Sequence, residues 1–334
     1  MSGIDLTLIW AGVIAFAVGA YVVMDGFDLG IGILFPAFRV GGERDMAMNS
    51  IAPVWDGNET WLVLGGGGLL AAFPLAYAII LPALYAPLTA MLLGLVFRGV
   101  AFEFRWRDPA HRAFWDVAFC GGSVLATFAQ GITLGALLQG IEVSGRAYAG
   151  GWWDWLTPFS LLTGVSLIVG YALLGSGWLI WKTQGPIQAD ARRFARPLMI
   201  ALIVAIAAVS AYTPFLENKY YQRWFEWPGL FATAPVPLLV AVTGFYLWRS
   251  IDDDRDHRPF WLTLALFGLS MMGLAISIYP DVIPGRVTIW EAAAPERSQI
   301  FMLVGAALLV PVILAYTVWA YWVFRGKVDE AGYH

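Results

Sequence analysis

Charged residues are scarce in this sequence. Only 13% of its 334 residues are Asp, Glu, Lys or Arg, whereas 59% are hydrophobic, and the mean hydropathy is +0.68. A soluble domain carries roughly 25% charged residues. Several apolar runs reach about 20 residues, the length of a helix that crosses a bilayer. The composition therefore excludes an ordinary soluble protein and predicts an all-α integral membrane protein.

Cysteine and histidine are almost missing as well. The single cysteine, Cys120, lies in an apolar segment, which excludes a disulfide framework and a cysteine-based metal site. The three histidines, His111, His257 and His334, all fall in predicted connections or the C-terminal tail. Haem in a membrane bundle normally takes an axial histidine from a helix. We therefore expect this chain alone to bind neither haem nor metal. A net charge of −4 without a basic patch also argues against nucleic acid as a partner.

Nine transmembrane helices are predicted from the apolar runs and the residues that interrupt them. They cover residues 6–37, 54–75, 77–102, 115–139, 158–181, 197–216, 229–248, 259–279 and 299–324. The first spans roughly 48 Å at about 1.5 Å per residue, so it must tilt in a hydrocarbon core about 30 Å thick or protrude from it. The connections are too short for a soluble domain, and residues 1–334 are predicted to form one polytopic domain.

The basic residues predict the orientation of the chain. With the N-terminus outside, the inside connections and the C-terminal tail hold 14 of the 20 Lys and Arg residues, and the outside connections hold 5. The remaining one, Arg98, falls within a helix. Because Lys and Arg accumulate on the cytoplasmic side, the N-terminus is predicted outside and the C-terminus inside.

Six ionisable residues lie in or at the ends of the first three predicted helices, all toward the cytoplasmic side. They are Asp25, Asp28, Asp56, Glu59, Arg98 and Glu103. Within each pair of acids, a spacing of three residues places both on one helical face. Charges that face lipid are costly, so these groups are expected to face the bundle interior or a wet cavity.

Two interpretations of these acids remain open. The acids form a proton or ion path from the cytoplasm, with Asp25 and Asp56 deepest, or Arg98 neutralises one or two of them and pins the helices. Glu59 is also a candidate cap at the start of the second helix. On that helix, the run Gly65–Gly68 lets another helix approach closely, either within the chain or from a partner.

Five stretches of the sequence carry a family resemblance. They read "DGFDLGIGILFP", "NSIAPVWDGNETWLV", "FRGVAFEFR", "TIWEAAAPERSQIFML" and "ILAYTVWAYWVFRGKV". In this order they resemble subunit II of the cytochrome bd-type quinol oxidases, including the branch called cyanide-insensitive oxidase, over essentially the whole chain.

The resemblance implies a fold of two four-helix bundles with a peripheral helix. It also implies a bacterial inner-membrane complex of the aerobic respiratory chain that oxidises quinol and reduces dioxygen to water. We expect subunit I to hold haems b and d and the quinol site. We expect no catalytic group in this chain. A small single-helix subunit and a structural quinone or lipid are further expected partners.

The resemblance also assigns roles to individual residues. Asp25, Asp28 and Asp56, beside Trp55, match the acids of a cytoplasmic-side proton pathway. Glu59 stands where relatives carry Gln, which argues against an essential role for it.

Two other functions fit the same acids. An autonomous proton-coupled transporter would use paired intramembrane carboxylates to bind its substrate or ion. A pure assembly scaffold within the same oxidase would hold every acid in an ion pair.

Overall fold

Long helices make up most of this computed structural model, which describes residues 5–328. The long helices are α1 (Leu6–Leu34), α3 (Trp55–Ala72), α5 (Tyr85–Arg107), α6 (Arg112–Leu138), α7 (Pro158–Lys182), α8 (Pro186–Tyr212), α11 (Pro235–Ser250), α12 (Arg258–Ile278) and α14 (Glu296–Val323). The short helices are α2 (Gly42–Asn49), α4 (Pro74–Ala83), α9 (Asn218–Phe225), α10 (Gly229–Thr233) and α13 (Ile289–Ala292). Single 3₁₀ turns are η1 (Phe35–Ala37), η2 (Pro109–His111) and η3 (Thr213–Phe215). Two small antiparallel hairpins pair β1 (Val143–Ser144) with β2 (Ala147–Tyr148) and β3 (Asp281–Ile283) with β4 (Val287–Thr288).

Eight helical segments in the described part of the chain are long and apolar enough to cross a membrane. This confirms the predicted all-α integral membrane class. The predicted helix 54–75 corresponds to α3, which has 18 residues and is not among the eight. Asp56, Asn58 and Glu59 in its first two turns lower its hydropathy.

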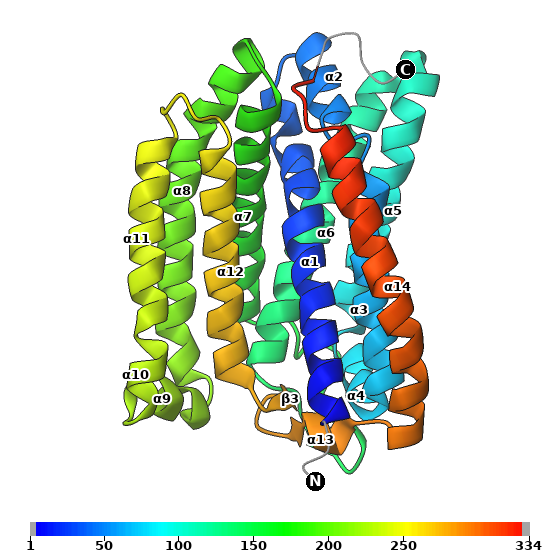
Figure 1. Cartoon of the computed structure of the whole chain (residues 1–334), viewed down its shortest axis with the longest axis vertical. Coiled ribbons are helices and arrows are strands. Elements are labelled where there is room, and N and C mark those ends of the chain that lie inside the picture. Colours follow the sequence, from blue (N-terminus) through cyan, green and yellow to red (C-terminus); the bar gives the residue numbers. More distant parts are fainter. Residues whose placement is uncertain (1–4, 329–334) are drawn as a thin grey trace.

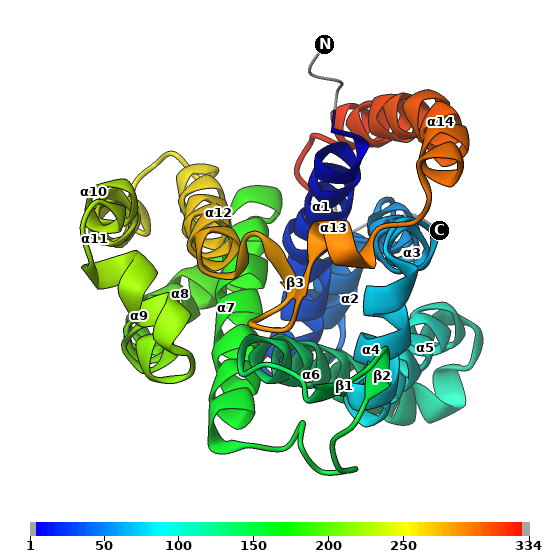
Figure 2. The ribbon, with the colours of Figure 1, turned by 90° about the horizontal axis from the view of Figure 1, so that it is seen from below.

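The long helices form two groups of four with one helix at the edge (Figures 1 and 2). α1, α3, α5 and α6 make the first bundle, and α7, α8, α11 and α12 make the second. α7 joins the bundles because it packs against both α1 and α6. α14 lies outside the first bundle and contacts α1 and α3. The predicted architecture of two bundles and a peripheral helix is therefore confirmed.

Several predicted helix boundaries were wrong, and proline explains two of the errors. One gap was predicted here, between helices 54–75 and 77–102. The structure instead has two breaks, at Phe73 and at Leu84, and α4 lies between them. Pro74 begins α4, and a residue before proline disfavours helical backbone. Pro82 and Pro87 flank the break at Leu84 and cannot donate backbone hydrogen bonds. In contrast, Pro197 lies inside α8 without ending it, so α8 begins at Pro186 rather than at the predicted 197.

Glycine allows α1 and α7 to meet at backbone contact. A Cβ added at Gly30 would lie 1.8 Å from the carbonyl oxygen of Tyr171, and one added at Gly175 would lie 2.5 Å from the carbonyl carbon of Gly30. No side chain fits in this space, since real Cβ atoms do not approach other atoms below about 3 Å. The contact between the two bundles therefore depends on glycine at these positions.

The predicted glycine run on α3 has two different faces. Gly65 and Gly68 pack on α1, where an added Cβ would lie 3.2 Å from Val18 and from Ile14 respectively. Gly66 and Gly67 have nothing within 4 Å of an added Cβ among the described residues. Close packing within the chain thus uses one face of the run and leaves the other exposed.

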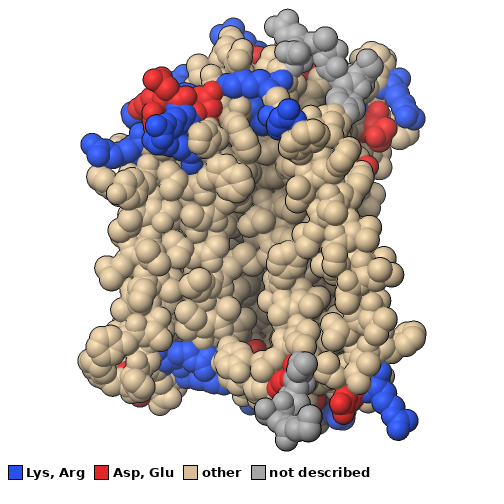
Figure 3. All heavy atoms as spheres, in the orientation of Figure 1, with Lys and Arg blue, Asp and Glu red and all other residues tan. Residues whose placement is uncertain are grey.

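Charge separates the two ends of the molecule from its middle. Figure 3 shows Lys, Arg, Asp and Glu gathered at both ends of the visible face, with a nearly uncharged band between them. α1 starts at one end and α14 finishes at the other (Figure 1). The connections predicted to be cytoplasmic, around α2, η2 and the α7–α8 and α11–α12 turns, all lie at the end where α14 finishes. We call this the C-terminal end.

Candidate functional site

Arg98 joins three helices of the first bundle through two carboxylates. Its side chain on α5 is 1% exposed, and its Nη1 donates to Oδ1 of Asp25 on α1 at 2.6 Å. Nη2 lies 3.2 Å from Oε1 of Glu59 on α3. A lone guanidinium thus neutralises one carboxylate and is shared with a second. The second of the two interpretations of the acids predicted such pairing, with Arg98 neutralising one or two of them.

Asp28 has a different set of partners, although it lies one helical turn from Asp25. Its Oδ2 accepts a hydrogen bond from Nδ2 of Asn58 at 2.7 Å, and Oδ1 of Asn58 accepts one from the Tyr321 hydroxyl at 2.9 Å. Asp28 is 0% exposed and Asn58 1%. Asp28 makes no salt bridge among the described residues. A neutral chain from α14 through α3 therefore holds this acid.

Sequence reasoning missed Asn58 and Tyr321. Asn58 lies between Asp56 and Glu59 but carries no charge, so the cost of burying charge does not single it out. Tyr321 lies 263 residues further along the chain, on α14. Only the fold brings the two together.

Trp55 covers the ionic group from the side. The Arg98 guanidinium carbon lies 6.0 Å from the centroid of its ring, within the range of a cation–π contact. The indole also stacks on Phe102 at 5.0 Å. Trp55 therefore covers one side of the Arg98 guanidinium.

Asp56 and Glu103 lie outside the buried group, contrary to expectation. Asp56 was expected among the deepest acids and as an alternative anchor for Arg98. It is exposed in the first turn of α3 and forms no ion pair among the described residues. Glu103 is also exposed and lies 3.4 Å from Arg107. Glu59 lies about one turn further along α3 and faces Arg98, with which it pairs rather than capping the helix.

Besides Glu59 Oε1 and Arg98 Nη2, which face each other, three buried oxygen atoms near the ion pair have no hydrogen-bond partner among the described residues. They are the Tyr21 hydroxyl, Oδ2 of Asp25 and Oδ1 of Asp28. Buried polar groups are normally satisfied by protein or by ordered water. Both acids thus keep one oxygen free to accept a proton or a water molecule.

A small polar pocket lies between the start of α3 and the end of α14. Its volume is about 130 Å³, and Asp56, Asn58, Thr317 and Tyr321 are among its lining residues. At about 30 Å³ per molecule it has room for roughly four waters. The pocket therefore connects the exposed Asp56 with the buried Asn58.

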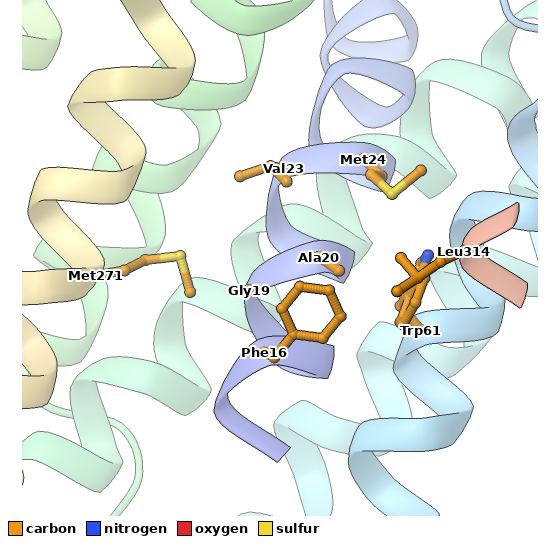
Figure 4. Close-up of a pocket in the computed structure, with 8 residues that line it drawn as sticks. All are labelled: Phe16, Gly19, Ala20, Val23, Met24, Trp61, Met271 and Leu314. Carbon is orange, nitrogen blue, oxygen red and sulfur yellow. The ribbon is translucent and has the colours of Figure 1, made fainter. Parts of the chain in front are cut away.

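A second, larger hollow is apolar. It has a volume of about 380 Å³ and lies between α1, α3, α12 and α14 (Figure 4). Phe16 and Trp61 contribute its aromatic surface, and Met24 and Met271 its sulfur atoms. Such a lining suits an acyl or isoprenoid chain.

Another ionic network, which the sequence did not predict, lies at the C-terminal end. Arg105, with 0% side-chain exposure, donates to Asp116 at 2.5 Å and to Asp45 at 2.8 Å. Arg44 adds a bond to Asp116 at 2.7 Å, and Arg112 pairs with Asp45. These contacts tie α2 to the facing ends of α5 and α6.

The histidines fit poorly as haem ligands. His111 lies in η2 with a side chain 71% exposed, 2.9 Å from Asp108, whose pKa the hydrogen bond holds below its ordinary value. His257 caps α12, and His334 lies outside the described residues. Within residues 5–328, no group of three or more His, Cys, Asp or Glu side chains could hold a metal ion. Neither of the two described histidines therefore lies within a bundle.

Comparison with known proteins gives a consistent assignment. The sequence model of the family described as cytochrome bd terminal oxidase subunit II matches residues 6–324. The cytochrome bd-I ubiquinol oxidase subunit 2 of Escherichia coli strain K12 is 29% identical, with 97% of this chain and 96% of the relative covered. The cytochrome bd ubiquinol oxidase subunit 2 of Bacillus subtilis strain 168 is also 29% identical, with 96% of each chain covered.

The fold comparison agrees with the sequence comparison. A chain from the structure of the bd oxidase from Geobacillus thermodenitrificans superposes with a TM-score of 0.79 at 15% identity, covering 97% of this chain and 100% of the other. The family match, unlike this fold similarity, shows the family to which the chain belongs. The chain belongs to the cytochrome bd terminal oxidase subunit II family and is a multi-pass subunit of a bacterial inner-membrane quinol oxidase complex.

Proposed function

We propose that this chain is the haem-free subunit of its oxidase, which supports the haem-bearing subunit I and supplies a proton path from the cytoplasmic side. The observation that carries this proposal is the buried group around Arg98, in which Asp28 lies beside the paired Asp25 and makes no salt bridge within residues 5–328. Acids inside membrane bundles are costly and commonly mark proton relays. Reduction of dioxygen to water consumes protons, so the complex needs such a route.

The three proposed path acids have different surroundings and therefore different roles. Asp56, exposed at the polar pocket, collects protons from the C-terminal end, which is the predicted cytoplasmic side. Asp28 holds them within the bundle, and Asp25 keeps the negative charge that balances Arg98. Glu59 shares this guanidinium and acts in support.

Haem has no place in this proposal for the chain itself. His111 is exposed and His257 lies at the start of α12, which supports the assignment of haem to the partner subunit. The apolar hollow of Figure 4 supports a structural quinone or lipid in this subunit, because its volume and lining fit part of a hydrocarbon chain. A small single-helix subunit completes the proposed set of partners.

Gentle purification tests the assignment against the autonomous transporter. We expect the chain to co-purify with a haem-containing subunit and with quinol oxidase activity. A colourless, monodisperse single chain that transports a substrate in liposomes would contradict the proposal.

Asp56→Asn tests the path at its exposed end. Turnover at saturating quinol should fall by about tenfold or more, since a positioned proton donor contributes roughly 10²–10⁴-fold to a rate. The haem absorption spectrum should stay unchanged. Asp254→Asn, which alters an exposed acid in the α11–α12 turn, is the matched control. Full turnover with full haem content in Asp56→Asn would remove Asp56 from the path, and lost haem would make it a structural residue.

A further inference from the structure

Asp25 and Asp28 are equally buried but are held in opposite ways. Asp25 contacts a permanent cation, Arg98, at 2.6 Å. Asp28 receives only the neutral amide of Asn58, and its second oxygen has no partner among the described residues. A carboxylate paired directly with a guanidinium is strongly held in its charged form. Asp28, which is held by an amide, can therefore gain and lose a proton more easily than Asp25.

The amide of Asn58 is oriented from both sides. Its NH₂ group donates to Asp28 Oδ2 and, at 3.2 Å, to the carbonyl oxygen of Met24, and its oxygen accepts from the Tyr321 hydroxyl. With the amide reversed, its oxygen would face the carboxylate of Asp28. Two acceptors in contact repel unless one of them carries a proton. The Met24 carbonyl, which can only accept, selects the orientation that supports ionised Asp28, and the Tyr321 hydroxyl strengthens it by donating to the amide oxygen.

An amide nitrogen does not itself pass on protons at neutral pH, so Asn58 acts by position. Asn58 and Tyr321 both line the polar pocket that also contains Asp56, whereas Asp28 does not. The pair therefore forms the wall between the pocket and the buried acid. Tyr321 reaches this wall from α14, the peripheral helix.

We propose that Asn58 and Tyr321 are positioning residues that make Asp28, rather than Asp25, the proton-exchanging acid of the bundle, and that α14 controls its access to the polar pocket. This inference rests on the proposed proton path. It gives the peripheral helix a part in proton transfer beyond packing against α1 and α3.

Other ionisable groups surround the acid pair and contribute to any pH dependence. They are Tyr21 on α1, Glu59 on α3, Arg98 on α5, Tyr171 on α7 and Tyr321 on α14. A test must therefore remove the hydrogen-bond chain without altering these charges.

Tyr321→Phe in the assembled oxidase meets this requirement. It removes one hydroxyl and keeps the ring that contacts Phe27 and Trp178 with centroid distances of 6.5 Å and 6.2 Å. At saturating quinol, the pH profile of turnover should move to higher pH by about half a unit to one unit, as expected when a carboxylate loses hydrogen-bond support. Asn58→Leu should shift the profile in the same direction by at least as much. Tyr246→Phe, which removes a hydroxyl on α11 in the second bundle, should leave the profile unchanged.

Asp28→Asn separates failure of this inference from failure of the proposed path. If Asp28→Asn keeps full turnover with full haem content, the path through Asp28 is wrong and the inference falls with it. If Asp28→Asn loses turnover while Tyr321→Phe keeps the wild-type pH profile, only the inference is overturned. Should Asn58→Leu fail to assemble with haem, the profile of Tyr321→Phe decides alone.

Discussion

Arg98 sets the charge balance inside the first bundle. It is 1% exposed and holds Asp25 and Glu59 from two other helices. A buried pair of this kind adds little net stability over an apolar replacement, but removal of one partner leaves an uncompensated charge. Loss of Arg98 would therefore leave a buried carboxylate without a counter-charge, and this cost is larger than the net stability that the ion pair adds.

Arg98→Gln should strongly destabilise the subunit, because it leaves Asp25 buried without its cation. We expect a loss of about 3–5 kcal/mol, the usual cost of breaking a buried pair. The measurement is thermal unfolding of the purified complex, followed by haem absorbance. The double variant Asp25→Asn with Arg98→Gln should recover part of the loss, since it removes both charges. Wild-type stability in the single variant would show that the pair is not a structural tie.

At the scale of residues, the sequence predicted which charged side chains group together but not which neutral side chains bind them. The cost of charge in a membrane made the grouping of Asp25, Glu59 and Arg98 predictable. The same argument placed Asp56 too deep, because a residue in the first turn of α3 can face outward. Asn58 and Tyr321 carry no charge, and nothing in their local sequence indicates that they meet.

At the scale of elements, α1 and α7 hold the two bundles together. Their contact is made by backbone atoms around Gly30 and Gly175, as the distances from an added Cβ show. Small residues allow this approach, and in a bilayer close packing is a main source of helix association. The relative position of the bundles is therefore sensitive to a single methyl group.

Gly30→Ala should separate α1 from α7 and destabilise the subunit. Overpacking typically costs about 1–3 kcal/mol, and here the obstacle is backbone that cannot rotate away. Gly12→Ala on the same helix is the matched control, because nothing lies within 4 Å of an added Cβ there. Thermal unfolding should show a lowered transition for Gly30→Ala alone. Equal transitions for the two variants would contradict the backbone contact.

The network at the C-terminal end makes a separate prediction for α2, α5 and α6. Arg105→Gln removes a buried guanidinium shared by Asp45 and Asp116, and it should lower stability by about 3–5 kcal/mol. Arg107→Gln, two residues along with a side chain 75% exposed, should change stability by less than about 1 kcal/mol. Denaturation of the two variants under identical conditions provides the comparison. A similar loss in both would argue that burial of Arg105 has no special effect.

Hydropathy predicted most of the long helices, but not where the chain bends. Pro82 and Pro87 break the predicted third helix, whereas Pro197 lies within α8. Whether a proline ends a helix depends on the packing around it, and this packing cannot be read from the composition of the sequence. The short helices α2, α9 and α10 lie in segments predicted as connections or helix ends, because each has too few apolar residues to be read as a span.

For the whole molecule, the predicted arrangement of connections agrees with the structure. The connections rich in Lys and Arg gather at the end where α14 finishes (Figures 1 and 3). Asp25 and Asp28 lie in the second half of α1, which is the half nearer that end. Family membership makes the chain a subunit of a quinol oxidase complex. Together these features support a proton path that opens on the cytoplasmic side and leads inward through α1 and α3.

Proton uptake by the assembled oxidase tests this central claim most directly. The complex would be reconstituted in liposomes with the C-terminal end outward, and uptake from the medium would be followed during a single reaction with dioxygen. We predict that Asp28→Asn slows this uptake by about tenfold or more while haem content and haem reduction stay normal. Uptake at the wild-type rate in Asp28→Asn would contradict a proton path through this subunit.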